Sequence, residues 1–327
     1  MRNGYGKYIE FDQPWWIDNA ASPNAIKPEI FVAIIPKARC LYDNGVVVSP
    51  GHRLLADVSW FRWDPKFKPQ MLPHPAMYEL MLPPIQHIDG RVAVISSLGH
   101  DNYYHWMFQI LPRFEVIQQY GIDPDYYVVN TNTPFQKESL QILHISEDRI
   151  LNPTNSTHIE ADELIVPSLL EPFGMNTSPP SRACFYLRSK FLKNNVPKRS
   201  DRALYITRDD ANVRRVLNEQ EIREDLMDNG FEVLSLSSFT LRQQVEMFSE
   251  AKIIVAPHGS GLTNAVFCER GSVLIEFMPE DRVENFFHRL ARIVGMEYYR
   301  IVGSKGGHRG DYTVNRAVLR KVLADLL

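Results

Sequence analysis

Short apolar runs alternate with amphipathic segments throughout the second half of the chain. The apolar runs are rich in β-branched residues and predict strands at residues 203–207, 231–236, 253–257, 273–277 and 298–302. Helices are predicted in the segments between them, from Asn218 to Gly230 and at residues 240–251, 262–268 and 283–294. Capping boxes are expected at Asn218 with Glu221 and at Thr240 with Gln243. This alternation indicates βαβ units and a parallel sheet.

The first half of the chain is less regular and richer in predicted strands. Strands are predicted at residues 30–35, 46–49, 92–97 and 126–130. A helix is predicted at residues 103–120, with a kink or break at Pro112, and another at residues 134–143, with proline in its first turn. The prolines at residues 65–84 predict a long surface loop or an extended arm.

A polar stretch interrupted by proline, at residues 194–201, separates the two patterns and is interpreted as a linker. It predicts an N-terminal α/β domain at residues 1–197 and a C-terminal domain at residues 198–313. Residues 314–327 carry apolar side chains at every fourth position and predict a final helix.

The composition is that of an ordinary soluble globular protein. Of the 327 residues, 44% are hydrophobic and 23% are charged, which argues against disorder, collagen and coiled coil. The net charge of −3 makes nucleic acid an unexpected main partner. No transmembrane run and no signal-peptide pattern is found, so a cytoplasmic location is expected. The dispersed Cys40, Cys184 and Cys268 predict free, buried thiols.

One glycine-containing loop, APHGSGLTN, directly follows the predicted strand at residues 253–257. Its two glycines permit a sharp turn and a close backbone approach, and its amides would open a helix, which is a favourable place for an anion. The candidate ligand-binding residues are His258, Gly259, Ser260, Gly261, Leu262, Thr263 and Asn264. A tight turn without a ligand explains this segment equally well.

Charged residues mark two other predicted strands: arginines follow one of them, and a carboxylate lies near the end of the other. Arg208, Arg214 and Arg215 come after the strand at residues 203–207, and arginine suits forked recognition of phosphate. Glu276 lies in the apolar run VLIEF. Burying a carboxylate there is costly unless it is paired with another group or has a function. It would accept hydrogen bonds from ribose hydroxyls or pair with an arginine. Together with the loop, these residues suggest a nucleoside-diphosphate ligand, although no P-loop or complete dinucleotide fingerprint is present.

A polar and aromatic cluster, GHDNYYHWMFQILPRF, follows the predicted strand at residues 92–97. His105 and Asp101 can each accept a proton, and histidine has the ordinary pKa nearer to neutrality. Contacts to a sugar-like ligand are expected from Asn102, Tyr104, Trp106 and Gln109. The alternative interpretation of His105 is a hydrogen-bonded histidine of the core.

No metal site is expected from the sequence. His100 and His105 are five residues apart rather than three or four, and no HExxH motif occurs. The Asp-x-Asp at Asp123 and Asp125 precedes a predicted strand, at the wrong end of the sheet, and is interpreted as a turn.

The motifs NYYHWMFQILPR, ITR with RRVLNE, PHGSGLTN and VLIEF occur in this order along the chain. In this combination the chain resembles glycosyltransferase family 61, over roughly residues 40–305. That family includes bacterial proteins of the capsular-polysaccharide type and eukaryotic xylosyl- and N-acetylglucosaminyltransferases. The position of Gln109 is often acidic in relatives, so a different group must be the base here if that acid is the base there.

The resemblance implies a GT-B fold: two Rossmann-like α/β domains with the active site in an interdomain cleft, and a C-terminal helix crossing back. It implies an inverting transfer, without a metal ion or other cofactor, from a nucleotide sugar to a glycan or other hydroxyl acceptor. Uridine diphosphate is the nucleotide expected from the family. The donor would contact Arg208, Arg214, the loop at residues 258–264 and Glu276, with His105 facing it. A location at a membrane that carries the glycan acceptor fits this activity.

Two other functions stay open at the level of sequence. The first is a non-catalytic protein of the same fold that binds a nucleotide or glycan, which Gln109 favours. The second is an enzyme that modifies a nucleotide sugar, such as an epimerase, and leaves the sugar on its nucleotide. Slow hydrolysis of a donor without acceptor would argue against the first.

Overall fold

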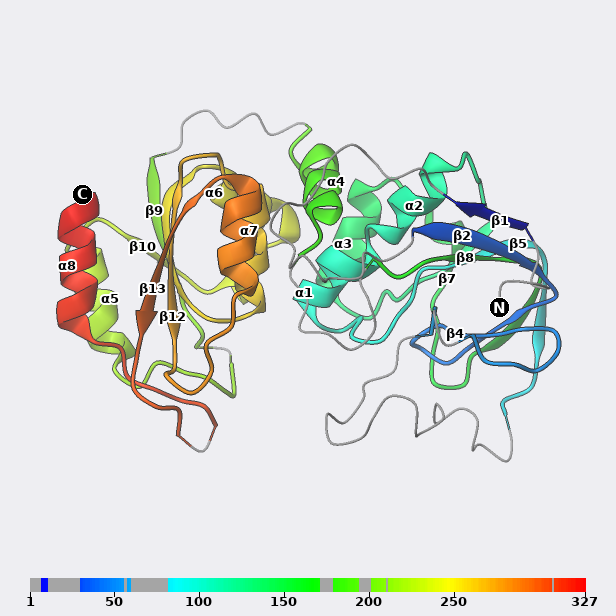
Figure 1. The fold of residues 1–327 in the computed structure, drawn as a ribbon, viewed down its shortest axis with the longest axis horizontal. Coiled ribbons are helices and arrows are strands. Elements are labelled where there is room, and N and C mark those ends of the chain that lie inside the picture. The colour runs from blue at the N-terminus through cyan, green and yellow to red at the C-terminus, as the bar shows by residue number, and fades with distance from the viewer. Residues whose placement is uncertain are drawn as a thin grey trace. The chain divides into compact units, whose positions relative to one another are not determined.

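The computed structural model of the chain describes residues 7–10, 30–55, 58–59, 82–170, 179–193, 201–209, 211–307 and 309–327. The chain divides into two compact units, Met1–Ala183 and Cys184–Leu327. Each unit contains a sheet with helices packed against it (Figure 1). The predicted linker, except Asp201, and most of the proline-rich stretch at residues 65–84 lie outside the described residues. The domain limits at residues 197 and 313 therefore stay predictions.

A five-stranded, entirely parallel sheet forms the centre of the C-terminal unit. Its strands are β9 (Arg202–Ile206), β10 (Glu232–Leu234), β11 (Ala251–Pro257), β12 (Val273–Met278) and β13 (Glu297–Val302). All five were predicted, and they lie in the order β10-β9-β11-β12-β13. This is the order of a doubly wound fold, in which the direction of chain progress reverses between β9 and β11.

Helices cover both faces of this sheet (Figure 1). On one face lie α5 (Glu219–Met227) and α8 (Arg316–Leu326), which pack into the core of the sheet. On the other lie α6 (Leu241–Ser249), α7 (Phe286–Val294) and the 3₁₀ helix η5 (Ser260–Phe267). A short 3₁₀ turn, η4 (Leu236–Ser238), follows β10.

Helix α8 is present near the predicted residues 314–327 and packs on the C-terminal unit, while the prediction that it crosses the cleft stays a prediction. Leu319 and Leu323 are buried in the C-terminal core. The carboxylate of Asp225, on α5, accepts hydrogen bonds from Arg316 at 2.8 Å and from Arg320 at 2.6 Å. These arginines hold the pKa of Asp225 well below its usual range. Apolar burial and two arginines on one carboxylate therefore fix α8 against α5.

The two predicted capping boxes have different outcomes. Thr240 caps α6 as predicted, since its Oγ1 accepts from the Gln243 backbone N–H and Oε1 of Gln243 accepts from the Thr240 N–H. Asn218 makes no side-chain cap for α5. Its side chain instead binds the N–H and the C=O of Val314, both at 2.9 Å. The amide is thus used to tie the start of α5 to the segment that leads into α8.

The N-terminal unit contains an eight-stranded mixed sheet in the order β1-β2-β8-β5-β6-β7, with β3 paired to β4 and β8. The strands are β1 (Lys7–Glu10), β2 (Phe31–Pro36), β3 (Arg39–Leu41), β4 (Val46–Val48), β5 (Gln86–Val94), β6 (Tyr126–Val128), β7 (Ile150–Leu151) and β8 (His158–Pro167). Strands β8, β5, β6 and β7 run parallel, whereas β1 to β4 pair antiparallel. The unit is therefore α/β as predicted, with an antiparallel part that was not predicted.

The predicted helix at residues 103–120 is present and is broken near Pro112, as expected. It consists of α1 (Tyr103–His105), one π-helical segment, η2 (Trp106–Ile110), and α2 (Arg113–Gln119). The N–H of Leu111 donates to the carbonyl of Trp106 at 2.9 Å, which is the wide turn of a π-helix. Such turns are frequent at functional sites.

Three further helical segments remain, two in the N-terminal unit and one that crosses the boundary between the units along the chain. They are α3 (Pro134–Ile142), the 3₁₀ turn η3 (Glu147–Arg149) and α4 (Ser181–Phe191), which spans the division. Helix α3 was predicted, whereas α4 was not. Among the described residues, no helix has both the length and the apolar character needed to cross a membrane.

The prediction for the cysteines is confirmed. Cys40, Cys184 and Cys268 are free and buried. Burial raises the pKa of the Cys40 thiol to about 12, so it stays protonated and unreactive.

Candidate functional site

Arg208 and Gly259 meet where the chain reverses direction in the C-terminal sheet. Arg208 follows β9 and Gly259 follows β11, so both lie at the carboxyl ends of neighbouring parallel strands. A Cβ on Gly259 would lie 1.8 Å from Nη1 of Arg208, so a glycine is needed for the guanidinium to approach this closely. Ligands of doubly wound sheets bind at this reversal point.

Arg214 and Arg282 add positive charge beside Arg208. The backbone of Arg214 is left-handed, with a φ of 57°, which is strained for a residue other than glycine. Burial lowers the pKa of Arg214, and the guanidinium groups of Arg208 and Arg282 lower it further. Its Nε is buried and has no hydrogen-bond partner in the described part of the chain. Binding an anion would lower the electrostatic repulsion between guanidinium groups that lie this close together.

Arg215 lies in a different setting from Arg208 and Arg214. Its side chain is half exposed and pairs with Asp311, with 3.3 Å between Nη2 and Oδ2. The backbone N–H of Arg215 donates to the same carboxylate at 2.8 Å. Because Asp311 neutralises it, Arg215 offers less charge to an anion than Arg214 does.

The loop after β11 forms the 3₁₀ helix η5 rather than an α-helix from Leu262. The N–H of Leu262 donates to the carbonyl of Gly259 at 3.0 Å, whereas the first N–H groups of a helix have no partner within it. Thr263 and Asn264 are fully buried, and Nδ2 of Asn264 donates to Gln244 at 2.8 Å. Residues 262–264 therefore hold the loop in place, and the amides of Ser260 and Gly261 stand at its open end.

His258 lies between two carboxylates. Its Nδ1 is 2.6 Å from Oε1 of Glu276, and its Nε2 is 2.9 Å from Oε2 of Glu284. Because a carboxylate only accepts hydrogen bonds, both ring nitrogens carry a proton and the imidazole is a cation. Burial lowers the pKa of His258, but the two carboxylates outweigh it, and the net pKa is raised. The loop after β11 thus begins on a buried imidazolium whose charge two carboxylates compensate.

Glu276 is completely buried and has a positioning role, which corrects the predicted ribose contact. Its Oε1 is bonded to His258, and its Oε2 accepts from the hydroxyl of Tyr298 at 2.6 Å. A carboxylate with no exposed surface cannot reach a ribose, and its partners are not the arginine considered as the alternative. Glu276 instead fixes the orientation and the charge of His258.

Glu284 joins His258 to the arginine cluster. The hydrogen bond from His258 is the main cause that lowers the pKa of Glu284 to about 2, and Arg282 donates to its other oxygen at 2.8 Å. Glu284, Arg282 and Tyr298 were not predicted from the sequence, because no motif marks them. For Glu284 and Arg282 the available signal was position alone, since residues 279–285 follow β12 at the same edge of the sheet, whereas Tyr298 lies within β13.

The His258–Glu284 pair predicts a pH dependence of stability. The contribution of Glu284 is complete above its unfolded pKa of 4.5 and is lost as the pH falls towards 2. That of His258 is complete below its unfolded pKa of 6.5 and is lost as the pH rises through its raised folded value. We therefore expect the difference in unfolding free energy between wild type and Glu284→Gln to be largest between pH 4.5 and 6.5. Urea titrations across this range measure it, and a difference independent of pH would contradict the pairing.

On the N-terminal unit, the helix after β5 holds His105 in a defined orientation. Oδ1 of Asn102 caps it by accepting from the N–H of Tyr104 at 2.9 Å and of His105 at 3.4 Å. Nδ1 of His105 lies 2.8 Å from Oε1 of Gln109. With the amide oxygen of Gln109 facing the ring, Nδ1 carries the proton and Nε2 has the lone pair that can take one. Gln109 thus orients His105 in the way a carboxylate would.

His105 is half buried in surroundings that favour the neutral imidazole. Its ring packs on Gly99, where a Cβ would lie 3.1 Å from Cδ2 of the ring and the φ is 83°. The ring of Tyr104 meets it edge-on, with 5.6 Å between centroids. Burial lowers the pKa of His105, opposed by Gln109 and by the nearby exposed Asp101. A neutral imidazole of this kind is ready to accept a proton.

Trp106 belongs to the core, which corrects its prediction as an acceptor contact. Its side chain is completely buried, and its Nε1 donates to Oγ of Ser139 at 2.9 Å. A ring without exposed surface cannot stack on a ligand. Its partner Ser139 lies on α3, so Trp106 packs the helix after β5 against α3.

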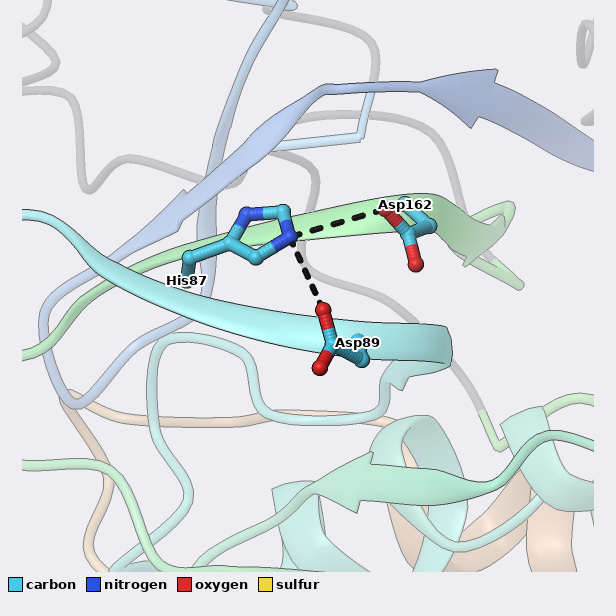
Figure 2. Close-up of side chains that lie close together, drawn as sticks. All are labelled: His87, Asp89 and Asp162. Carbon is cyan, nitrogen blue, oxygen red and sulfur yellow. Dashed lines mark ion pairs between the residues drawn. The ribbon is translucent and has the colours of Figure 1, made fainter.

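His87, Asp89 and Asp162 form the one group among the described residues with side chains placed to hold a metal ion (Figure 2). Nε2 of His87 lies 3.3 Å from Oδ1 of Asp89 and 3.5 Å from Oδ1 of Asp162. Nζ of Lys37 is 2.6 Å from the same Asp162 oxygen, and the N–H of Gly90 donates to the other at 2.8 Å. Asp162 already has a cation and an amide on its oxygens, so this cluster fits a surface ion-pair network better than a metal centre.

The Asp-x-Asp segment lies in the turn before β6, as predicted. Asp123 pairs with Nη2 of Arg149 at 2.7 Å, and Asp125 accepts from the backbone N–H of Arg91 at 2.7 Å. Both carboxylates are therefore used by groups that hold the turn.

Comparison with known proteins identifies one family. The sequence matches the family Glycosyltransferase 61 over residues 103–275, which is more than half of the chain. The match begins in the helix that carries His105 and ends in β12, so it includes Arg208 and the loop that begins at His258. No curated protein matches the sequence.

Proposed function

Since the chain belongs to glycosyltransferase family 61 and is therefore a glycosyltransferase, we propose that it transfers a sugar from a nucleoside-diphosphate donor to a hydroxyl acceptor with inversion. The observation that supports this most is the arginine cluster, Arg208, Arg214 and Arg282, at the reversal point of a parallel sheet. Glu284 pairs with Arg282, and a diphosphate would supply negative charge to Arg208 and Arg214. Uridine is the proposed nucleoside.

The proposed reaction is a direct displacement at the anomeric carbon. The acceptor oxygen forms a bond to that carbon while the bond to the donor phosphate oxygen breaks, and the acceptor proton passes to a base. The arginines and the amides at Ser260 and Gly261 stabilise the departing diphosphate with fixed charge in place of a metal ion. The imidazolium of His258 is compensated by Glu276 and Glu284, so it holds this loop in position rather than adding net charge.

The proposed base is His105, because Gln109 leaves Nε2 of its ring as the proton acceptor. In this proposal the two units form a GT-B arrangement, with the donor on the C-terminal unit and the acceptor on the N-terminal one. Both units support it, since each has parallel strands whose carboxyl ends carry the polar residues. Polysaccharide synthesis in the cytoplasm, at a membrane that carries the acceptor, is the proposed setting.

A thermal-shift screen tests the donor assignment. Uridine, guanosine, adenosine and their diphosphates are compared, and the protein should melt at a higher temperature with one diphosphate but not with its nucleoside. A ligand at 100 times its Kd stabilises the fold by about 2.7 kcal/mol. The corresponding nucleotide sugars are then incubated with the protein. Slow release of free sugar supports a transferase, whereas conversion into an isomeric nucleotide sugar identifies an epimerase.

Removal of metal ions is expected to leave the activity unchanged. The arginine cluster already supplies the charge that a divalent ion would provide. Donor hydrolysis is therefore measured with and without excess EDTA. Loss of activity on chelation, restored by manganese, would show that the reaction needs a divalent ion and would contradict this part of the proposal.

A further inference from the structure

The short turn η4 lies beside the loop that follows β11. It follows β10, which pairs parallel with β9, so η4 stands at the same edge of the sheet as Arg208 and Gly259. A Cβ on Gly261 would lie 2.9 Å from Cδ1 of Leu236, so the side chain of Leu236 packs against the backbone of Gly261. The position of η4 therefore bears directly on the open end of the loop.

Gln244, on α6, binds both η4 and η5 through one amide. Its Nε2 donates to the carbonyl of Leu236 at 3.0 Å and to that of Phe239 at 3.1 Å. Its Oε1 accepts from Nδ2 of Asn264 at 2.8 Å. The orientation of this amide is settled, because a carbonyl only accepts and the nitrogen must therefore face the two carbonyls. One side chain thus joins the turn after β10 to the helix after β11.

Helix α6 gives this amide a firm support. Thr240 and Gln243 cap its first turn in a capping box, and its apolar face is buried. Gln244 is half buried on the same helix, and its partner Asn264 is completely buried on η5. Because both supports are fixed, the amide of Gln244 sets the distance between η4 and η5.

We propose that Gln244 is a positioning residue of the donor site, which holds η4 against the loop after β11 so that the backbone N–H groups of Ser260 and Gly261 are presented to the diphosphate. The inference rests on the proposed function and adds to it a residue outside the segments expected to contact the donor. Backbone donors stabilise charge on a leaving group only when they are held in place before the reaction.

The exposure of η4 favours a role at the site over general support of the fold. Leu236 is half buried, and Ser237 and Ser238 are exposed, so this turn adds little to the core. Two hydrogen bonds from one side chain nevertheless hold it. What the turn contacts is Gly261, at the end of the loop that carries the proposed phosphate-binding amides.

Gln244→Glu separates the two sets of contacts. The carboxylate keeps an acceptor for Asn264 but, when ionised, donates nothing to the carbonyls of Leu236 and Phe239. When protonated, it can donate to one of them again. The ordinary pKa of glutamate is about 4.3, and burial beside two carbonyls raises it. The affinity of this variant, relative to that of the wild type, should therefore depend on pH.

Calorimetry with uridine, guanosine and adenosine diphosphate is carried out between pH 5 and pH 8. At pH 8, Gln244→Glu and Gln244→Ala should bind the diphosphate roughly two- to tenfold more weakly than the wild type, the range for one neutral hydrogen bond. Towards pH 5 the deficit of Gln244→Glu should shrink by about twofold or more, because one hydrogen bond returns, whereas that of Gln244→Ala should stay constant. Gln220→Glu is the matched control, since Gln220 is exposed on α5 and bonds to Glu224 of its own helix.

Thermal unfolding of the same samples separates positioning from support of the fold. If Gln244→Glu melts at a lower temperature but binds the diphosphate as the wild type does at pH 8, the proposal is overturned and the proposed function stands. A deficit that is equal at pH 5 and pH 8 overturns it as well, because the two carbonyls would then have no part in the effect. Glutamate matches glutamine in size, so this comparison does not depend on the alanine variant. If the wild type binds none of the three diphosphates, the proposed function itself fails.

Discussion

Replacing Arg214 by glycine is expected to weaken binding of the nucleoside diphosphate by about 1.5–3 kcal/mol, or roughly 10- to 150-fold, the range for charge-assisted hydrogen bonds. Arg214 stands beside two other guanidinium groups, and its buried Nε has no partner in the described residues. Its backbone φ of 57° costs nothing for glycine, so the same variant should be as stable as the wild type or more stable. Loss of affinity with a gain in stability is the result expected of a strained binding residue.

Calorimetry with the nucleoside diphosphate and thermal unfolding of the same samples measure both effects. Arg208→Ala should weaken binding by a similar factor, because its guanidinium lies against Gly259 at the reversal point. Arg242→Ala is the matched control, since Arg242 is exposed on α6 of the same unit and should change neither quantity. Unchanged affinity in both test variants would show that the phosphates bind elsewhere.

The C-terminal fold could be predicted because its strands are short apolar runs separated by helices with clear ends. Such runs are buried on both faces of a parallel sheet, so the apolar pattern and the structure agree, as in β11 and β12. The N-terminal unit offered less information. Strands β3 and β7 are three and two residues long. Runs this short cannot show the alternation of apolar and polar residues by which a strand is predicted.

The sequence could predict those residues of the candidate site that directly follow a strand. Arg208 and His258 follow strands, and strand ends meet at one edge of a parallel sheet. Partners across the sheet could not be predicted, because the contacts of Glu276 with His258 and Tyr298 depend on the register of three strands. Trp106 was misassigned because its contact with Ser139 on α3 joins residues far apart in the sequence.

Replacing His105 by alanine is expected to lower kcat by about 10²–10⁴, the usual contribution of a positioned general base. Gln109 fixes the ring so that Nε2 is the proton acceptor. Burial lowers the pKa of His105 from 6.5, so the wild-type rate should rise with pH through a limb below that value and then level off. The alanine variant should lose this limb. Donor affinity should stay within about a factor of two, because the arginine cluster is untouched.

Gln109→Leu separates the base from its orientation. The leucine leaves the imidazole in place but removes the oxygen that holds its tautomer, so kcat should fall by less than in His105→Ala while the acidic limb of the pH profile persists. Gln109→Glu keeps an acceptor and should retain more activity than the leucine variant, with the limb moved to higher pH by the added charge. If His105→Ala instead keeps more than about a tenth of the wild-type kcat, histidine is not the base. Asp101, the exposed carboxylate in the turn before the helix, is then the group to replace.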